Sequence, residues 1–370
     1  MVNHMLELAT LVRKYRGALI ERRGYLPENQ FKALNAIESC RNDFSKSINC
    51  HCPNCKHEHW RLASCKNRHC PKCQHKDADR WLTTQCERLI PVTHFMATFT
   101  APCQLRNMMF YNQSEAYTAF FEAVKATLDE VGSDPRCLGG KYGYTAILHT
   151  WNRRLDYHPH IHCIIPGGAF DQEKNIWRKS SNEYFFNVKN LSKIFKGKLF
   201  IALKKRGLTK NLPRGSFKQE LVVHVKPVGK GKEALKYIAP YIFRVAISNR
   251  RIIALKNDMV TFEYKNSKTK LIEQRTLHAV DFLELYLKHV LPDNFMKVRN
   301  YGLCHHSNRL ILDKLAVLLN WKQPHLHLKS TPIQKCPECG SELMTTFLFA
   351  ITQRQLARVE KSIIKQEAPP

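Results

Sequence analysis

The sequence predicts an α+β protein in which an antiparallel sheet is flanked by helices. Residues 112–131 and 190–206 carry apolar side chains at the three- and four-residue spacing of amphipathic helices. Residues 143–151 and 157–166 have the pattern of two strands, and the turn between them is short enough for a hairpin. With 370 residues, the chain is long enough to form two or three domains with a proper core.

Three domains are expected along the chain. Residues 1–95 combine two helical segments with a cysteine-rich stretch, and predict an N-terminal helical and zinc-binding domain. Residues 96–275 contain the two predicted strands and form the central domain. Residues 276–370 predict a small C-terminal helical region, with helical patterns at 276–290 and 308–319 and a candidate second zinc knuckle.

Two Cys-x-x-Cys pairs are separated by fourteen residues in the N-terminal domain. Each pair makes a tight turn that points two thiolates the same way, so two pairs supply the four ligands of a tetrahedral zinc site. The prediction is one structural Zn²⁺, because four thiolates leave no open position for catalysis; a redox dithiol is the weaker alternative. The predicted ligands are Cys52, Cys55, Cys70 and Cys73.

Other cysteines remain outside this predicted zinc site. Cys40 and Cys65 could hold a second zinc together with a histidine. The isolated pair Cys336 and Cys339 also forms a knuckle, but one pair cannot close a tetrahedral site. Its expected partners are drawn from Cys304, His305 and His306.

Three histidines lie on one side of the predicted strand at 157–166. Because strand side chains alternate, His158, His160 and His162 share a face and stand about 6–7 Å apart. Neighbouring imidazoles at this spacing can close on one cation, so the run predicts a divalent metal site. The alternative is a set of ordinary half-buried histidines. His149, on the preceding strand, is expected beside the metal without binding it, or simply buried.

Two tyrosines four residues apart make the second functional candidate. On a helix, Tyr237 and Tyr241 would project from one face, one turn apart, with Lys236 beside them. Such a pair is usually part of a core, and Pro240 bends or ends the helix before the second tyrosine. Together with an upstream metal strand in a basic protein, a catalytic role becomes the leading explanation.

The charge balance indicates a polyanionic partner. Lys and Arg number 59 against 31 Asp and Glu, which gives a formal charge of +28. This charge is spread along the chain and not confined to one helix, which favours nucleic acid over a membrane surface. No apolar run approaches the roughly 18 residues of a membrane span, so a cytoplasmic protein without a membrane partner is expected.

Together these motifs resemble a known family. The run His160-Ile161-His162 is similar to the signature of the HUH endonucleases. The longer pattern from Leu148 to Gly168, with the tyrosine pair, resembles the two-tyrosine transposases of rolling-circle insertion sequences, and the stretch 64–74 looks like their N-terminal zinc-binding domain. The sequence departs from the family pattern at Asn152, Arg153 and Ile48.

The resemblance implies an HUH endonuclease catalytic domain that cuts and rejoins single-stranded DNA at transposon ends in the bacterial cytosol or nucleoid. His160 and His162 would hold Mn²⁺ or Mg²⁺, with His158, Glu233 or another carboxylate as third ligand. One tyrosine would attack to give a 5′-phosphotyrosine link, and the second would allow another strand exchange. The expected phosphate contacts are Lys236, Arg244 and Arg250.

Three other functions stay open. A plasmid replication initiator or relaxase would use the same site without this zinc module. A non-catalytic zinc-dependent regulator would bind duplex DNA and form no covalent adduct. An inactivated transposase would bind DNA but not cut it.

Overall fold

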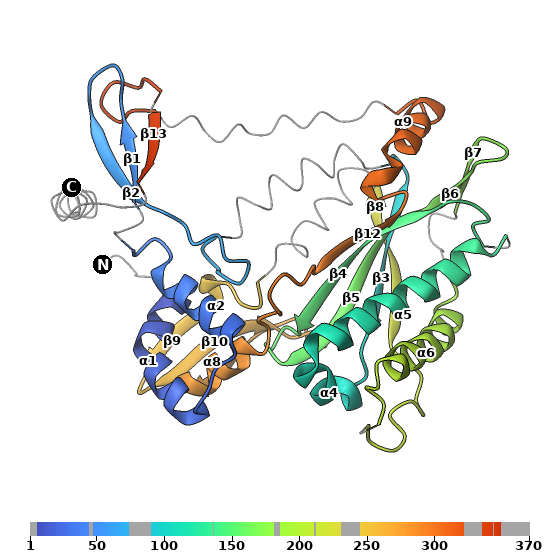
Figure 1. The fold of residues 1–370 in the computed structure, drawn as a ribbon, viewed down its shortest axis with the longest axis horizontal. Coiled ribbons are helices and arrows are strands. Elements are labelled where there is room, and N and C mark those ends of the chain that lie inside the picture. The colour runs from blue at the N-terminus through green and yellow to red at the C-terminus, as the bar shows by residue number, and fades with distance from the viewer. Residues whose placement is uncertain are drawn as a thin grey trace.

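The computed structural model describes residues 6–43, 47–73, 90–135, 137–180, 186–210, 212–230, 245–321, 335–342 and 344–348. Within these residues a five-stranded antiparallel sheet with helices on one face stands beside a smaller unit of helices and three strands (Figure 1). The predicted α+β class is therefore confirmed.

The five-stranded sheet has the strand order β12-β4-β5-β3-β8, and every neighbouring pair is antiparallel. The predicted hairpin is present at its centre, because β4 and β5 are adjacent strands joined by the turn at 152–156. In this turn the Asn152 side chain accepts hydrogen bonds from the backbone N–H groups of Arg154 and Asp156. The strands are β3 (Thr93–Thr100), β4 (Gly143–Trp151), β5 (Tyr157–Pro166), β8 (Val223–Lys230) and β12 (Val298–Gly302).

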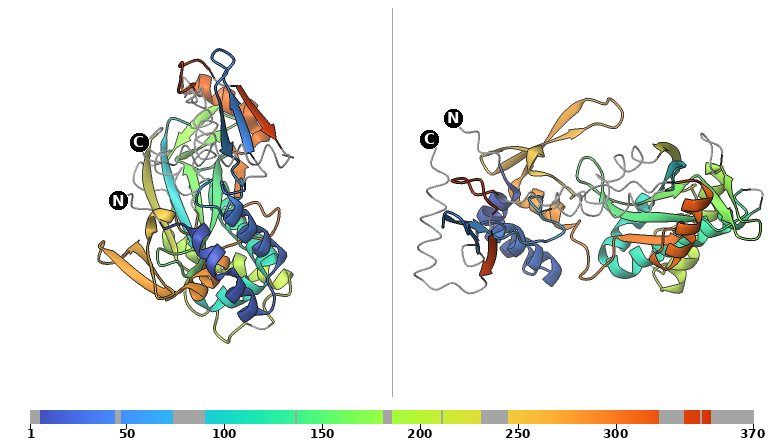
Figure 2. Two further views of the ribbon diagram at one scale, coloured as in Figure 1. Left: turned by 90° about the vertical axis from the view of Figure 1, so that its left-hand side faces the viewer. Right: turned by 90° about the horizontal axis from the view of Figure 1, so that it is seen from above.

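Helices cover one face of this sheet. Helices α5 (Gln113–Ser133) and α6 (Val188–Lys205) pack side by side on it, and the right-hand view of Figure 2 has them on one side of the strands. The rings of Phe99 and Phe195 meet edge to face there, with centroids 5.1 Å apart. Alternate strand residues point into this core, so the intervening residues, including the histidines, point to the opposite face. Helix α4 (Arg106–Tyr111) and the short turn η1 (Cys103–Leu105) complete this layer.

The smaller unit joins distant parts of the chain. The N-terminal helices α1 and α2 pack with α8 and with a sheet of order β11-β10-β9, around the buried side chains of Leu11, Leu34, Phe262 and Phe282. This core combines residues from all three expected domains, whose boundaries at 95 and 275 stay a prediction. The elements are α1 (Leu8–Arg23), α2 (Glu28–Ser39), η2 (Asn249–Arg251), β9 (Ile252–Lys256), β10 (Met259–Lys265), β11 (Ile272–His278) and α8 (Ala279–Leu287).

A third sheet brings the two ends of the chain together. Its order is β13-β1-β2, so the central strand comes from the N-terminal part and one edge strand from the C-terminal part (Figure 1, upper left). The strands are β1 (Ser47–His51), β2 (Glu58–Leu62) and β13 (Met344–Leu348). At the other end of the molecule, a hairpin of β6 (Gly168–Asp171) and β7 (Ile176–Lys179) packs on α9 (Arg309–Leu318), which follows η3 (His306–Asn308).

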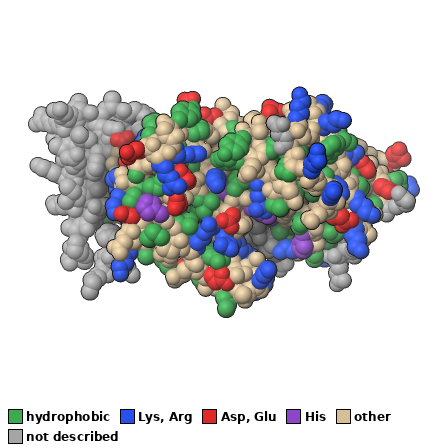
Figure 3. Space-filling model, turned by 90° about the horizontal axis from the view of Figure 1, so that it is seen from below, with side chains coloured by type: hydrophobic (Ala, Val, Ile, Leu, Met, Phe, Trp, Pro, Cys, Tyr) green, Lys and Arg blue, Asp and Glu red, His purple; other side chains and the backbone are tan. Residues whose placement is uncertain are grey.

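Basic side chains do not gather in one patch on the described part of the face drawn in Figure 3. Over the described part of the face that it draws, Figure 3 shows scattered Lys and Arg side chains with acidic side chains between them. In the part of the chain that the structure describes, none of the helices has the length and apolar character needed to cross a membrane.

Candidate active site and metal centres

Three histidines converge on the sheet face opposite the helices. His149 on β4 lies directly across from His160 on β5, and His162 is two residues further along β5 on the same face. Their ligand nitrogens all lie within 4.8 Å of one another. His149 and His162 are buried, whereas His160 is half-buried. We call these three residues the histidine cluster.

Hydrogen bonds orient two of these rings. Nδ1 of His160 lies 2.7 Å from the carbonyl oxygen of His158; this oxygen can only accept, so Nδ1 donates and Nε2 is the ring nitrogen that could bind a metal. Nδ1 of His162 lies 2.9 Å from Oγ1 of Thr98 on β3. Such contacts set the ring orientation and tautomer of metal-binding histidines. With metal–nitrogen bonds of about 2.0–2.2 Å, the cluster fits one divalent cation.

The third histidine of the cluster is His149. The expected ligand His158 instead forms a hydrogen bond with Arg106. Nδ1 of His158 lies 2.7 Å from Nη2 of Arg106, which can only donate. Burial and the neighbouring Arg106 cation lower the pKa of His158. His158 shares a face with His160, as predicted, but the cross-strand neighbour His149 reaches the cluster instead. The assignment of His158 as a metal ligand is therefore corrected.

The histidine cluster opens into a cavity of about 610 Å³. The β4–β5 turn and the hairpin of β10 and β11 form its other walls. The cations Arg153, Arg154, Lys265 and Lys268 line it, against the single carboxylate of Glu273. An anionic ligand is therefore favoured in this cavity.

The remaining predicted site residues are not all placed. Glu233, Lys236, Tyr237, Tyr241 and Arg244 lie outside the described residues, so their roles stay predictions. The expected phosphate contact Arg250 is exposed in η2 and does not line the cavity.

Arg251, which no sequence motif singles out, has a positioning role. Its guanidinium donates to the carbonyl oxygen of Glu263 at 2.7 Å and to that of Arg153 at 2.6 Å. It thereby joins the β10–β11 hairpin to the β4–β5 turn.

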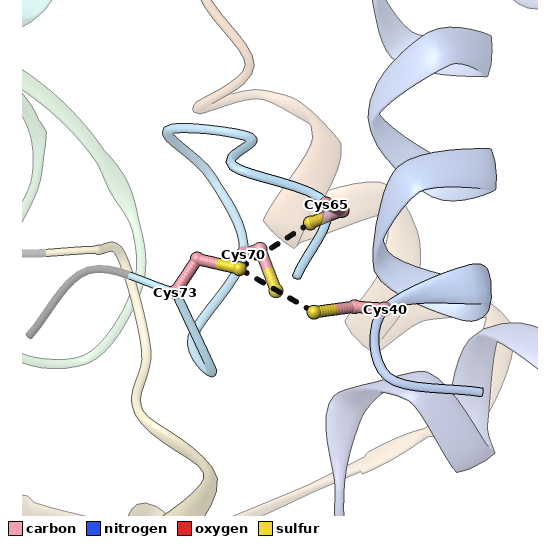
Figure 4. A group of neighbouring side chains, drawn as sticks. All are labelled: Cys40, Cys65, Cys70 and Cys73. Carbon is pink, nitrogen blue, oxygen red and sulfur yellow. Dashed lines mark hydrogen bonds between the residues drawn. The ribbon is translucent and has the colours of Figure 1, made fainter. Parts of the chain in front are cut away.

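The first cysteine cluster contains Cys40, Cys65, Cys70 and Cys73, whose sulfur atoms converge in Figure 4. The Sγ atom of Cys73 is 3.4 Å from that of Cys40 and 3.6 Å from that of Cys65. Four sulfurs bound to one zinc at about 2.3 Å stand roughly 3.8 Å apart, whereas a disulfide would require about 2.05 Å. The geometry therefore fits a closed Zn²⁺ site.

The second cysteine cluster contains Cys52, Cys55, Cys336 and Cys339. The Sγ atoms of Cys52 and Cys339 are 3.5 Å apart, and those of Cys55 and Cys336 are also 3.5 Å apart. This spacing again fits four thiolates around one zinc. Two ligands come from the N-terminal part of the chain and two from the C-terminal part.

These groupings correct the predicted zinc ligands. The pairs Cys52/Cys55 and Cys70/Cys73 were expected in one site, but each lies in a different cluster. Strand β2 lies between the two pairs and spans about 16 Å, at 3.3 Å per residue. Each knuckle therefore lies beside a different set of cysteines. Cys304, His305 and His306 do not join Cys336 and Cys339. The available signal for two sites was the presence of three Cys-x-x-Cys knuckles together with Cys40 and Cys65.

The first cysteine cluster is tied to the smaller unit and to the sheet. Arg68, between its ligands, donates to the carbonyl oxygens of Phe295 and Pro292. His69 is half-buried, its Nε2 accepts from the backbone N–H of Leu291, and desolvation lowers its pKa to about 3. Both side chains serve packing, which makes this cluster part of the folded core.

Comparison with known proteins gives a consistent result. Residues 143–310 match the family model described as "Putative transposase", and residues 11–101 match "Transposase zinc-binding domain". The chain is 30% identical over 383 residues to "Putative transposase y4qJ" of Sinorhizobium fredii (strain NBRC 101917 / NGR234), covering 92% of this chain and 94% of that one. It is 25% identical over 330 residues to "Transposase for insertion sequence element IS801" of Pseudomonas savastanoi pv. phaseolicola, covering 81% and 79%. No solved structure matches the chain.

Proposed function

This chain belongs to the transposases of rolling-circle insertion sequences that carry an N-terminal zinc-binding domain, and on that premise we propose that it nicks and rejoins single-stranded DNA at transposon ends. The observation that carries the proposal is the convergence of His149, His160 and His162 on a cavity lined by basic side chains. Three imidazoles with an open side form a catalytic type of metal site, since a structural site would be closed by a fourth protein ligand.

The proposed ion at the histidine cluster is Mn²⁺ or Mg²⁺, with oxygen ligands from water and the DNA phosphate completing its shell. When bound, the cation supplies Lewis-acid stabilisation of charge on the scissile phosphate. The chain's own contribution is orientation: the carbonyl of His158 and the hydroxyl of Thr98 hold the rings of His160 and His162. The cations of the cavity then hold the DNA backbone beside them.

The proposed nucleophile is Tyr237 or Tyr241. Its phenol oxygen forms a bond to the scissile phosphorus, the bond from phosphorus to the 3′ oxygen breaks, and the phenol proton passes to the leaving oxygen through solvent. The products are a 5′-phosphotyrosine link and a free 3′-hydroxyl. Attack of a 3′-hydroxyl on this link restores a phosphodiester and the phenol, so rejoining requires no nucleotide cofactor. The second tyrosine permits a second exchange before the first DNA end is released.

The experiment is a covalent-adduct assay with labelled single-stranded end DNA and Mn²⁺. The wild-type chain should give a labelled band that survives denaturation, and Tyr237→Phe/Tyr241→Phe should bind the DNA without forming it. Full adduct formation by the double variant would refute the tyrosine assignment. Binding without any adduct in the wild type would instead favour a non-catalytic DNA-binding protein.

A further inference from the structure

We propose that the C-terminal knuckle completes a second zinc site with the N-terminal knuckle, so that Zn²⁺ holds the two ends of the chain together. The zinc-binding family model spans residues 11–101 and does not include Cys336 or Cys339. Each knuckle by itself offers two thiolates, and a closed structural site requires four ligands. The proposed site is thus complete only when segments about 280 residues apart meet, as the separation of 281 between Cys55 and Cys336 shows.

Other ligand-type side chains lie near these four cysteines but are not part of the converging set. Cys50 is buried, and its sulfur accepts a hydrogen bond from Nε of Arg61 at 3.2 Å. Nδ1 of His51 lies 3.5 Å from Glu58, and Nδ1 of His57 lies 4.0 Å from Glu338. Among the described residues, the set with converging ligand atoms here is therefore the four-cysteine one.

Strand pairing supports the same closure independently. Strands β1 and β13 pair in register from Ser47 opposite Leu348 to His51 opposite Met344. Three five-residue strands make a very small sheet, and no hydrophobic cluster of the described chain includes a residue of β1 or β2. A module without its own hydrophobic core needs a metal ion or another cross-link to fold. Zinc binding and the association of the two knuckles are therefore expected to occur together.

Zinc content and thiol protection test this proposal on the full-length protein. Metal analysis should find two zinc ions per chain in the wild type and one in Cys336→Ser/Cys339→Ser. The same count of one is expected for Cys52→Ser/Cys55→Ser and for the quadruple variant, because all four cysteines serve one ion. A control with the exposed Cys103→Ser and Cys137→Ser should retain both ions.

Alkylation with a maleimide, read by mass spectrometry, is the decisive second measurement. Cys339 is exposed, yet it should be protected in the wild type and become reactive in Cys52→Ser/Cys55→Ser. Unchanged protection in that variant, or a quadruple variant that loses more zinc than either double variant, would overturn the proposal.

A second inference, which rests on the proposed function, concerns the β10–β11 hairpin. We infer that its tip holds the phosphates of the DNA strand that enters the histidine cluster. Lys265 and Lys268 line the same cavity as Arg153 and Arg154, and Nη1 of Arg153 donates to the carbonyl oxygen of Lys265 at 3.4 Å. The one carboxylate there, Glu273, accepts from the hydroxyl of Tyr264 at 2.6 Å and from Asn266 at 2.5 Å, and these hydrogen bonds, the first above all, lower its pKa.

The hairpin is held at a set distance from the histidine strand. Nη1 of Arg275 donates to the carbonyl oxygen of Arg154 and to Oδ1 of Asp156, both at 2.7 Å. Arg251 makes a second bridge between hairpin and turn, as described above. The basic side chains of the cavity are therefore held in place before DNA binds. This reduces the free-energy cost of ordering them when a flexible strand binds.

The test compares Lys265→Ala/Lys268→Ala with Lys256→Ala, an exposed lysine on β9 that does not line the cavity. In Lys265→Ala/Lys268→Ala, the affinity for single-stranded DNA should fall, and the salt dependence of binding should correspond to about one to two fewer released ions. Lys256→Ala should show neither change. Wild-type-like binding by the cavity variant, with an active wild type, overturns this inference alone. Failure of the wild type to form the covalent adduct overturns the proposed function instead.

Discussion

In the described part of the chain, the candidate metal sites are the histidine cluster and the two cysteine clusters, and they differ in how completely their ligands would enclose an ion. Each cysteine cluster offers four thiolates that surround an ion completely. The histidine cluster offers three imidazoles from one sheet face and opens into a cavity of about 610 Å³. The closed sites are suited to stability, whereas the open one leaves positions for water and phosphate. The structure thus separates metals that hold the fold from the metal proposed to act on DNA.

The largest expected effect comes from breaking the buried cysteine cluster. Cys70→Ser removes one of four ligands at a site that packs against the core of the smaller unit. Apparent zinc binding energies of structural sites are about 10–16 kcal/mol, so much of the folding energy of this region depends on the ion. Loss of one zinc and a melting temperature lowered by 10 °C or more are expected, measured by metal analysis and calorimetry. An unchanged melting temperature would show that this cluster is not a folding site.

A smaller effect concerns histidines that only support the fold. His289 is buried between Thr150 and the carbonyl of Leu155, and burial lowers its pKa to about 4. In the unfolded chain this imidazole has a pKa near 6.5 and therefore binds a proton more readily. The contribution of His289 to the free energy of unfolding is fully present above pH 6.5 and is lost as the pH falls toward 4. Between pH 7.5 and pH 5, the fall in the free energy of unfolding should be about 2 kcal/mol smaller in His289→Gln than in the wild type.

Urea unfolding at the two pH values, with zinc supplied, measures that difference. A variant whose pH dependence equals that of the wild type would contradict the assignment of His289 as a neutral packing residue.

The smallest expected effect sharpens the description of the open site. Thr98→Val removes the hydroxyl that lies 2.9 Å from Nδ1 of His162. Partners of metal-binding histidines typically contribute about 10–100-fold to affinity or activity. The variant should bind Mn²⁺ more weakly and form the adduct about tenfold more slowly at low metal, with recovery at high metal. A rate defect that metal does not restore would mean that Thr98 acts in another way.

The fold was predictable where local patterns decide it. The β4–β5 hairpin follows from strand alternation and a short turn, and both appear in the structure. The helical pattern at 276–290 was only partly correct, because Thr276, Leu277 and His278 pair with β10 and α8 begins at Ala279. Backbone pairing there outweighs the apolar spacing, and the His278 side chain caps the helix by accepting from the N–H of Val280.

The metal sites were harder to predict because they depend on pairings across the chain. Residue types and knuckles identified metal binding, but spacing cannot tell which knuckle meets which, and Cys52 meets Cys339 rather than Cys70 or Cys73. The same limit applies to His149. The register that sets it opposite His160 includes an irregularity between His149 and Trp151, which no pattern in the sequence specifies.

The central claim is that the open cluster of His149, His160 and His162 cuts DNA with a divalent cation. It is tested most directly by the rate of adduct formation on single-stranded end DNA, with and without Mn²⁺, for His149→Ala beside His158→Ala. His149→Ala should lower the metal-dependent rate by about 100-fold or more at an unchanged melting temperature, while His158→Ala stays close to the wild type. A full rate in His149→Ala, with the loss confined to His158→Ala, would contradict this account.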